Sequence, residues 1–599
     1  MSNINPNPFT TRPEIEGTFG VVTSTHWIAT AVGMATLEKG GNAFDAAVAT
    51  AFTLQVVEPH LNGPGGDVPV LVFDVRRGRP EVICGQGTAP AAATIAHYRA
   101  LGLDMVPGTG LLAACVPGTF ETWMLLLRDY GTLRLADVLT PAIDYAAQGH
   151  PLAERASATI ATVEGLFRDH WPTSAEVYLP GGTVPAPAAL FSNKTLAQTY
   201  ARILAEAQSA GSDRVAQIER ARRAWSQGFV AEAIDRFCRT QEVMDVSGER
   251  HRGVLTGADM AAWDPTIEPP QTYDYGHYTV CKAGVWSQGP VLLQQLALLK
   301  GFDLDGLDPT GPDFVHLQVE CAKLAFADRE AFYGDPKFVD VPITTLLSDA
   351  YNTERRKLVS ERASLEMRPG TVAGFGGKID QTRRADTTRA AALGAGEPTV
   401  GRMGEVVGDT VHFDIVDRAG NMVSSTPSGG WLQSSPVIPE LGFCLGTRAQ
   451  MFWLDEGHPA AIAPGKRPRT TLSPTLALRN GEPYLAWGTP GGDQQDQWTA
   501  QFFLRHVHAG FNLQESIDAP AWHSEHFPIS FWPRTAQPGV LVVESRLPEA
   551  TIKALRARGH KVEVGPAWSE GRLTAASQVG PRRRAAANPR GMQGYAAGR

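Results

Sequence analysis

One threonine, Thr410, lies where the sequence could generate a hydrolytic nucleophile. Residues 411–416 alternate apolar and polar side chains, which predicts a β-strand with one buried face. The tract before it, residues 369–405, has almost no apolar periodicity. One explanation is that the chain is cut between Asp409 and Thr410, so that Thr410 becomes an N-terminus. The other is that Thr410 is an ordinary strand threonine after a loop, and spacing alone favours this second explanation.

The chemistry of an N-terminal threonine explains why such a cut would matter. A threonine hydroxyl is a poor nucleophile near neutral pH and needs a base within hydrogen-bond reach. A free α-amine on the same residue is such a base, with an ordinary pKa of about 7.7–8.0. While the bond from Asp409 to Thr410 is intact, that nitrogen is an amide and cannot accept a proton. Cleavage would therefore both expose and activate the hydroxyl.

Two other segments could serve the same chemistry. Gly491 and Gly492 follow a predicted strand and precede a predicted helix, where backbone N–H groups can point into a cavity. Such donors stabilise the oxyanion of a tetrahedral intermediate by about 3–4 kcal/mol each, although a Gly-Gly turn alone is weak support. The polar stretch 466–474 either lines a site or is a loop with capping hydroxyls. The glycine loop 62–67 is equally well explained as a plain connection or as a ligand contact.

The elements that would position these residues alternate between strands and helices. The Asp417–Asn421 turn is predicted to join the Thr410 strand to a second strand as a hairpin. The whole pattern predicts an α/β fold with two main sheets and helices outside them. The predicted strands are 20–24, 68–75, 81–84, 411–416, 422–426, 475–479, 484–487, 541–543 and 561–564, and the predicted helices include 26–38, 43–57, 116–127, 135–148, 314–332, 498–509 and 548–558.

Composition excludes several other classes of protein. The chain has 599 residues, of which 43% are hydrophobic, and a net charge of −8, which argues against a general nucleic-acid binder. The run 582–584 of three arginines is interpreted as a solvated patch. Six scattered cysteines show neither CxxC nor His pairing, so no metal site is predicted. No apolar leader and no 18-residue apolar run are present, which predicts a cytoplasmic protein without a membrane span.

Motifs of rival enzymes are missing from the sequence. There is no G-x-S-x-G elbow, no H-E-x-x-H and no G-x-x-x-x-G-K-[ST]. Ser434 and Ser435 are alternative nucleophiles by residue type, but the sequence offers them no obvious His or Asp partner.

The chain resembles the gamma-glutamyltransferase (glutathione hydrolase) family of N-terminal-nucleophile enzymes. The resemblance runs from about Gly20 to Tyr595. The motifs that carry it are Glu38-Lys39-Gly40-Gly41-Asn42-Ala43-Phe44-Asp45-Ala46-Ala47, Val116-Pro117-Gly118-Thr119, Ala327-Asp328-Arg329, Gly334-Asp335-Pro336, Asp417-Arg418-Ala419-Gly420-Asn421, Gly465-Lys466-Arg467-Pro468, Ser473-Pro474-Thr475 and Pro490-Gly491-Gly492.

The resemblance implies a four-layer αββα sandwich and autocatalytic cleavage before Thr410. The products would be a large subunit of residues 1–409, with a flexible linker at about 369–409, and a small subunit of residues 410–599 that stays associated with it. Thr410 would attack an amide, Gly491 and Gly492 would hold the oxyanion, and Ser428 would occupy the place of a family threonine that bonds the nucleophile. No metal or organic cofactor, nucleic acid or membrane partner is implied.

The resemblance also places a small amide substrate against six residues, and several of them depart from the family pattern. Neutral Gln86 stands where the family has the arginine that grips the substrate α-carboxylate. Trp453 stands where the family has the aspartate that binds the α-ammonium. The six residues are Gln86, Gly430, Gln450, Trp453, Thr470 and Thr471. Losing one partner of a charge-assisted contact costs about 1.5–3 kcal/mol, and here both are gone.

We therefore predict a self-processing amidohydrolase or acyltransferase of this family that cleaves γ-glutamyl compounds or a related acyl amide. The alternative within the class is an oxamate amidohydrolase-like or cephalosporin (glutaryl) acylase-like enzyme without γ-glutamyl activity, in which Arg448 or Arg469 supplies a displaced carboxylate clamp. The alternative of another class is a silent homologue that acts as a binding or structural protein.

Overall fold

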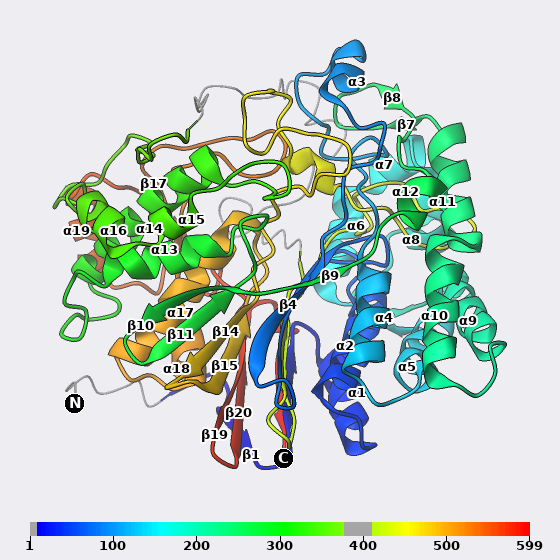
Figure 1. Ribbon diagram of the computed structural model, residues 1–599, viewed down its shortest axis with the longest axis horizontal. Helices are drawn as coiled ribbons and strands as arrows, with labels where there is room; N and C mark the ends of the chain where they lie inside the picture. Colours follow the sequence, from blue (N-terminus) through cyan, green and yellow to red (C-terminus); the bar gives the residue numbers. More distant parts are fainter. Residues whose placement is uncertain (1–8, 377–409) are drawn as a thin grey trace.

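Two seven-stranded sheets lie face to face between two layers of helices (Figure 1). This computed structural model describes residues 9–376 and 410–599. Neighbouring strands in both sheets pair antiparallel throughout the registers observed. The predicted four-layer αββα sandwich is therefore confirmed. Asp409 and most of the predicted 369–409 linker lie outside the described residues.

The first sheet carries the strand that follows Thr410. Its strand order is β21-β2-β12-β13-β3-β4-β9. β12 is an interior strand, with Phe413 opposite Ser24 of β2 on one side and opposite Ser425 of β13 on the other. The strands are β2 (Val21–Ser24), β3 (Val68–Asp74), β4 (Arg79–Gly85), β9 (Thr266–Glu268), β12 (Phe413–Val416), β13 (Met422–Ser425) and β21 (Tyr595–Gly598).

The second sheet carries the strand that leads into Gly491 and Gly492. Its strand order is β1-β20-β19-β15-β14-β11-β10. β15 lies in the centre and ends at Gly488, opposite Thr574 of β19. The strands are β1 (Ile15–Gly17), β10 (Gln271–Tyr275), β11 (Tyr278–Lys282), β14 (Thr475–Arg479), β15 (Glu482–Gly488), β19 (Thr574–Val579) and β20 (Arg582–Ala587).

Three hydrophobic cores hold the four layers together. Between the sheets, side chains such as Leu71, Val416 and Ala576 are fully buried. On its outer face the first sheet packs against helices through residues such as Phe52 and Phe413. The second sheet packs outward on a separate set of helices. Fully burying one such apolar side chain contributes about 1.5–3 kcal/mol, so these cores fix the spacing of the layers on which the site depends.

The helices that cover the first sheet come from residues 27–261, and those that cover the second sheet come from residues 290–557. Helices on the first sheet are α1 (Trp27–Glu38), α2 (Ala43–Val57), α4 (Thr119–Asp129), α5 (Leu135–Gln148), α9 (Lys194–Gln208), α10 (Arg214–Ser226), α11 (Phe229–Thr240) and α12 (Gly257–Ala261). Helices on the second sheet are α13 (Pro290–Leu299), α14 (Pro312–Phe332), α15 (Ile343–Leu346), α16 (Asp349–Arg356), α17 (Gln495–His508), α18 (Leu513–Asp518) and α19 (Glu549–Ala557).

The remaining elements form smaller units. A three-stranded sheet and two short hairpins lie outside the main sheets. The elements are α3 (Ile95–Ala100), α6 (Glu154–Thr162), α7 (Glu164–Asp169), α8 (Pro172–Tyr178), β5 (His150–Pro151), β6 (Leu190–Phe191), β7 (Val243–Met244), β8 (Arg250–His251), β16 (Trp522–Ser524), β17 (Val540–Glu544) and β18 (Lys561–Gly565), with 3-10 turns η1 (Pro180–Gly182), η4 (Arg448–Met451), η5 (Gly492–Gln494) and η6 (Arg590–Met592).

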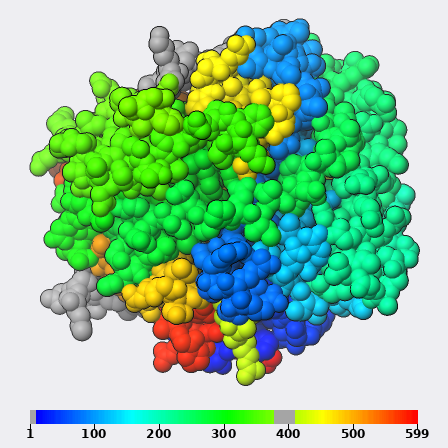
Figure 2. Space-filling model, in the orientation of Figure 1, coloured from blue at the N-terminus to red at the C-terminus, as the bar shows by residue number. Residues whose placement is uncertain are grey.

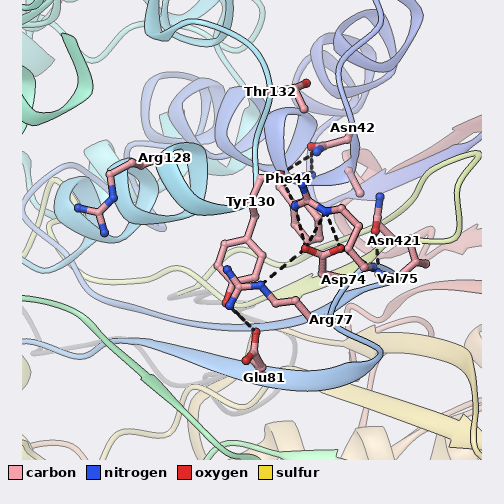
Figure 3. Close-up of polar contacts among 12 residues, drawn as sticks. Asn42, Phe44, Asp74, Val75, Arg77, Glu81, Arg128, Tyr130, Thr132 and Asn421 are labelled. Atoms are coloured by element: carbon pink, nitrogen blue, oxygen red, sulfur yellow. Dashed lines mark hydrogen bonds and ion pairs between the residues drawn. The ribbon is translucent and has the colours of Figure 1, made fainter. Parts of the chain in front are cut away.

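The predicted turn between β12 and β13 anchors the central hairpin to its neighbours. Asp417 accepts a hydrogen bond (2.9 Å) from the backbone N–H of Ala43, the first residue of α2. Asn421 accepts one (3.0 Å) from the N–H of Val75 at the end of β3, as Figure 3 shows. Asn42, in the same view, caps α2 with its side chain. These contacts fix the hairpin at the end away from Thr410.

Two predictions about local structure are corrected. The strand after Thr410 begins at Phe413 rather than at Val411, because Thr410 instead forms an isolated bridge to Ser428. The arginine run 582–584 is the start of β20 rather than a solvated patch. Arg583 is buried there and donates to the carbonyl oxygen of Asp417 (3.0 Å), which adds a further tie on the hairpin turn.

Candidate functional site

Thr410 is fully buried and lies directly beside Ser428. The two residues form an isolated antiparallel bridge, and the Thr410 hydroxyl donates a hydrogen bond of 3.2 Å to the Ser428 hydroxyl. The N–H of Val411 donates to the carbonyl oxygen of Pro427 (3.1 Å), which extends the pairing by one residue. The structure thus brings together the two hydroxyls that the sequence separates by 18 positions.

The glycine loop 62–67 forms the wall behind Ser428. Asp67 and Ser428 exchange both backbone hydrogen bonds, at 2.9 and 3.0 Å. A Cβ on Gly66 would lie 2.0 Å from the Ser428 carbonyl oxygen, and a Cβ on Gly63 would lie 2.2 Å from that of Gly430. Only glycine permits such an approach. This loop, for which the sequence left two explanations open, packs directly against Ser428 and against the predicted substrate residue Gly430.

A buried polar network supports the strand that follows Thr410. The His412 ring bonds Thr426 Oγ1 at 2.8 Å through Nδ1 and Asp414 at 3.0 Å through Nε2. Asp414 also accepts from Thr574 of the facing sheet (2.8 Å). The sequence analysis missed this network, although polar residues at alternate positions of a central strand are the signal that could have found it, because the face they share packs between two sheets.

The exit of β15 lies against the same network. A Cβ on Gly488 would lie 2.3 Å from His412 Cε1, so the end of β15 contacts the segment between Thr410 and β12. Gly491, three residues on, has a φ of +123° and packs against the Trp498 ring, where a Cβ would lie 2.3 Å from Cζ3. Gly492 has a φ of +52°. Both positions favour glycine, and they carry the predicted oxyanion donors out of the end of the second sheet.

A buried network of side chains holds the Gly492–Asp493 turn. Asp493 accepts an ion-paired hydrogen bond from Arg329 and two bonds of 2.7 Å from Ser530, through its N–H and its hydroxyl. Gln288 donates to the Gly492 carbonyl oxygen (3.1 Å) and accepts from Arg329 (2.8 Å). Arg329 belongs to a family motif that the sequence analysis left without a role. Here it holds the turn that carries Gly492, one of the predicted oxyanion donors.

The same network reaches the predicted substrate residues Thr470 and Thr471. The N–H of Gln288 donates to the Thr470 carbonyl oxygen (2.8 Å). The Thr471 hydroxyl is buried and has no hydrogen-bond partner among the described residues. Arg469, one of the two expected carboxylate clamps, instead pairs with Glu330 at 2.7 Å. Arg469 is therefore not available as a clamp in this arrangement.

Gln86 and Arg448, by contrast, meet beside Ser428 through Asp67. Arg448 binds the Asp67 carboxylate side-on, with Nε and Nη2 both at 2.9 Å. Burial raises the pKa of the Asp67 carboxyl, while Arg448 and a hydrogen bond from Gln86 lower it. Gln86 also lines a cavity of about 480 Å³, a size typical of small-molecule sites. The second expected clamp, Arg448, thus lies next to the predicted nucleophile pair.

Gln450 and Trp453 are engaged by neighbours in their own segment and by residues 532–534. Gln450 accepts from the N–H of Trp532 (3.1 Å) and donates to Thr447 Oγ1 (3.0 Å). Trp453 stacks on His458 with ring centroids 4.7 Å apart, and its indole nitrogen has no hydrogen-bond partner in the described part of the chain. This segment, yellow in Figure 2, lies beside the blue segment near α3. No contact observed among the described residues links either side chain to Thr410.

One group of described residues has metal-ligand character, but its surroundings oppose a cation. His316, Glu320 and His560 lie within ligand distance of one another. The Lys323 ammonium bonds Glu320 at 2.6 Å, and the two imidazoles bond each other at 2.8 Å. This group therefore does not fit a resident metal.

Among the described residues, no helix is long and apolar enough to cross a membrane.

Two antiparallel sheets stacked between two layers of helices define the architecture of the N-terminal nucleophile hydrolases. The profile of the family described as Gamma-glutamyltranspeptidase matches residues 29–598. The chain belongs to this family.

Named relatives of the chain carry several activities. It is 32% identical to the Acylase ACY 1 proenzyme of Pseudomonas sp. (strain SE83), covering 92% of this chain and 88% of that protein. It is 31% identical to the Glutathione hydrolase-like YwrD proenzyme of Bacillus subtilis (strain 168), covering 92% of both. It is also 31% identical to the Oxamate amidohydrolase proenzyme of Klebsiella pneumoniae subsp. pneumoniae, covering 92% and 93%.

Solved structures share the whole fold. A structure of a protein called LmbA2991 is 56% identical, with a TM-score of 0.92 over 99% of this chain and 100% of that one. Cephalosporin acylase from Bacillus halodurans is 28% identical, with a TM-score of 0.82 over 100% and 99%.

Proposed function

We propose that this protein is a self-processing amidohydrolase in which Thr410 is the nucleophile. The observation that carries the proposal is the buried Thr410–Ser428 pair, whose hydroxyls lie 3.2 Å apart just before β12. Cleavage between Asp409 and Thr410 would give subunits of residues 1–409 and 410–599. The word proenzyme in the names of three relatives supports this processing.

The proposed reaction is acyl transfer through Thr410. The free α-amine takes the hydroxyl proton while Oγ1 forms a bond to the amide carbon. The N–H groups of Gly491 and Gly492 stabilise the oxyanion of the tetrahedral intermediate. The carbon–nitrogen bond then breaks, the proton passes to the leaving amine, and an ester on Thr410 remains. Water attacks this ester by the same route, releasing the acid and regenerating Thr410.

The residues around the site support an acyl group other than γ-glutamyl. Neutral Gln86 and apolar Trp453 stand where the family reads the two charges of the glutamyl group. The guanidinium of Arg448 beside Gln86 is already engaged side-on by Asp67. Relatives named acylase and oxamate amidohydrolase support a small acyl amide as the substrate. An efficient release of glutamate from glutathione, with a kcat near ~10 s⁻¹, would contradict this part of the proposal.

The two subunits would remain one folded unit after cleavage. β12, β13 and β21 from the small subunit lie among β2, β3, β4 and β9 from the large one. The second sheet mixes the two parts in the same way. Separating the subunits would break backbone hydrogen bonds and expose all three cores, so we expect dissociation only on unfolding.

The test compares purified wild-type protein with Thr410→Ala by denaturing gel and intact mass. The wild type should split between Asp409 and Thr410, and the variant should stay whole. Thr279→Ala, a strand threonine in β11 away from the site, is the control and should split normally. A wild-type chain that remains full-length after prolonged incubation would overturn the proposal and favour the silent homologue.

A further inference from the structure

A buried ion pair joins β11 to the first turn of α17. The ammonium of Lys282, the last residue of β11, lies 3.0 Å from the Asp496 carboxylate, and both side chains are fully buried. The motifs found in the sequence include neither residue. Burial lowers the pKa of Lys282, and Asp496 opposes this shift. Burial likewise raises the pKa of Asp496, and Lys282 opposes that shift.

Stability alone does not explain why these two charges are buried. Taking an ammonium and a carboxylate out of water costs several kcal/mol per ion, and an apolar pair of similar volume is often as stable or more stable. Arg329, whose charge also acts on Asp496, is itself paired with Glu330 and Asp493. Lys282 is therefore the partner that Asp496 depends on, and what the pair holds becomes the question.

Ser473 is the residue that this pair holds. Its carbonyl oxygen accepts from the Lys282 ammonium at 2.9 Å, and its hydroxyl donates to Asp496 at 2.8 Å. Its N–H donates to the side-chain oxygen of Gln495 at 3.0 Å. The remaining ammonium donor goes to the Thr475 hydroxyl at 2.8 Å. Because an ammonium has three N–H donors, every polar group of Lys282 and of Ser473 is bonded, and Ser473 is fixed against α17.

The segment 470–473 is tied to the Gly492–Asp493 turn at both of its ends. At one end, the N–H of Gln288 donates to the Thr470 carbonyl oxygen at 2.8 Å, and its side chain donates to the Gly492 carbonyl oxygen at 3.1 Å. At the other end, Ser473 is bonded to the first turn of α17, which begins three residues after Gly492. Helical residues rise about 1.5–2 Å each, so this second tie reaches the chain within about 8 Å of Gly492.

Thr471, one of the predicted substrate residues, lies between these two ties. Its hydroxyl is buried and has no hydrogen-bond partner among the described residues, so no hydrogen bond of its own side chain fixes its position there. The N–H of Leu472 donates to Thr470 Oγ1 at 3.3 Å, within the same segment. The position of the Thr471 hydroxyl relative to Gly492 is therefore set by the backbone between Thr470 and Ser473.

We propose that Lys282 and Asp496 are positioning residues that hold Thr471 at a fixed distance from the oxyanion donors Gly491 and Gly492. They act through Ser473 rather than on the substrate. This inference rests on the proposed function of Thr410 and deepens it. A substrate that contacts Thr471 while its carbonyl oxygen is bound at the two glycines has to match that distance, so the ion pair contributes to the rate rather than to stability.

The test replaces the ion pair by an apolar pair of similar size, Lys282→Met with Asp496→Leu. Because such replacements are often neutral or stabilising, the double variant should melt at or above the wild-type temperature. Ser473 loses two of its three ties, and a misplacement of about 1 Å can lower a rate about a hundredfold. We therefore expect kcat to fall about tenfold to a hundredfold, measured on γ-glutamyl- or glutaryl-p-nitroanilide, whichever the wild type hydrolyses.

A second variant keeps the test decisive if the double variant does not fold. Ser473→Ala retains the ion pair and loses only the hydroxyl bond to Asp496 (2.8 Å). Its kcat should fall about three- to tenfold, with little change in melting temperature. A pair with a purely structural role would leave kcat unchanged in any variant that is as stable as wild type.

The matched control is Lys323→Met with Glu320→Leu. This Lys–Glu pair is also buried, with 2.6 Å between its charged atoms, but it lies in α14 and bonds Ser364 and Arg368. No contact observed in the described ranges links it to the segment 470–473. The control should keep its kcat whatever happens to its melting temperature.

Hydrogen exchange measured by mass spectrometry reports the ties without any substrate. Loss of a local tie lowers the free energy of local opening and speeds exchange. Peptides that cover residues 470–473 and 491–496 should both exchange faster in Lys282→Met/Asp496→Leu than in wild type, and at the wild-type rate in the control. A wild-type kcat in the folded double variant, or unchanged exchange in the segment 470–473, would overturn the inference.

Failure of the two proposals can be distinguished. If wild type neither cleaves itself nor hydrolyses either probe, the proposed function fails, and the exchange rates still decide whether the ion pair holds the segment. If wild type cleaves itself and hydrolyses a probe while the double variant keeps its full kcat, only the positioning role is overturned.

Discussion

Replacing Asp493 by asparagine tests whether the turn after Gly492 must be held rigidly. One carboxylate oxygen accepts from Arg329 and from the Ser530 hydroxyl, and the other accepts from the Ser530 N–H. Asparagine offers one acceptor oxygen, so its NH₂ group must face a donor on one side or the other. Arg329 keeps its bond to Glu330 (2.7 Å), so the variant loses one charge-assisted bond rather than a whole ion pair.

The expected magnitude follows from these contacts. Loss of one hydrogen bond to a charged group lowers the free energy of unfolding by about 1.5–3 kcal/mol. If the turn relaxes and half of the 3–4 kcal/mol effect of one oxyanion donor is lost, kcat falls about 10–30-fold. KM should stay near its wild-type value, because the donors act on charge that develops only in the transition state.

The assay combines steady-state hydrolysis of Asp493→Asn with denaturant unfolding and intact mass, which reports self-cleavage. Glu121→Gln is the matched control, because Glu121 is also a buried carboxylate paired with an arginine, Arg222, but lies in the outer helix α4. It should lose stability and keep its kcat. The reasoning is refuted if Asp493→Asn loses as much stability as the control while its kcat is unchanged.

Two further predictions concern single side chains. Ser428→Ala keeps the backbone pairing to Thr410 but removes the 3.2 Å hydrogen bond, so it should lower the rate of self-cleavage and kcat about three- to tenfold. Ser428→Thr should restore both rates. Equal rates in all three proteins would contradict the assigned role. Burial lowers the pKa of the His523 imidazole, but Glu570 raises it to about 10 overall. The stability of wild type relative to His523→Asn should therefore be full below pH 6.5 and decline towards pH 10, and a difference that grows with pH in thermal melts would contradict this sign.

Elements with strong periodicity could be predicted from the sequence. α2 has the predicted bounds, because Asn42 caps it and a continuous apolar run fills it. The β12–β13 hairpin was found from the alternation on both sides of a polar turn. α17 begins at Gln495 rather than at Trp498, because its first turn is polar but buried, and burial by tertiary packing leaves no mark on local sequence.

The candidate site was predictable only in part. The sequence pattern indicated the position of Thr410 before a buried strand. Its pairing with Ser428 was predicted only from the family resemblance, because nothing in the spacing indicates which segment lies beside Thr410. Arg469 was expected near the substrate, whereas in the structure its guanidinium forms an ion pair with Glu330. Arg448 and Asp67 could not be linked at all. Residues 381 positions apart meet only through the order of strands and helices, which composition and periodicity do not encode.

The interleaved sheets determine when during synthesis the proposed cleavage can occur. β2 pairs with β21 at one edge of its sheet, and β1 pairs with β20 at one edge of the other. The ribosome synthesises the N-terminal strands first, so β1 and β2 cannot pair with β20 and β21 until those later strands have been made. Thr574, which donates a hydrogen bond to Asp414 near Thr410, is also synthesised late. Under the proposed function, Thr410 would therefore remain unsupported in a nascent chain, and an unfinished polypeptide would not cut itself in two.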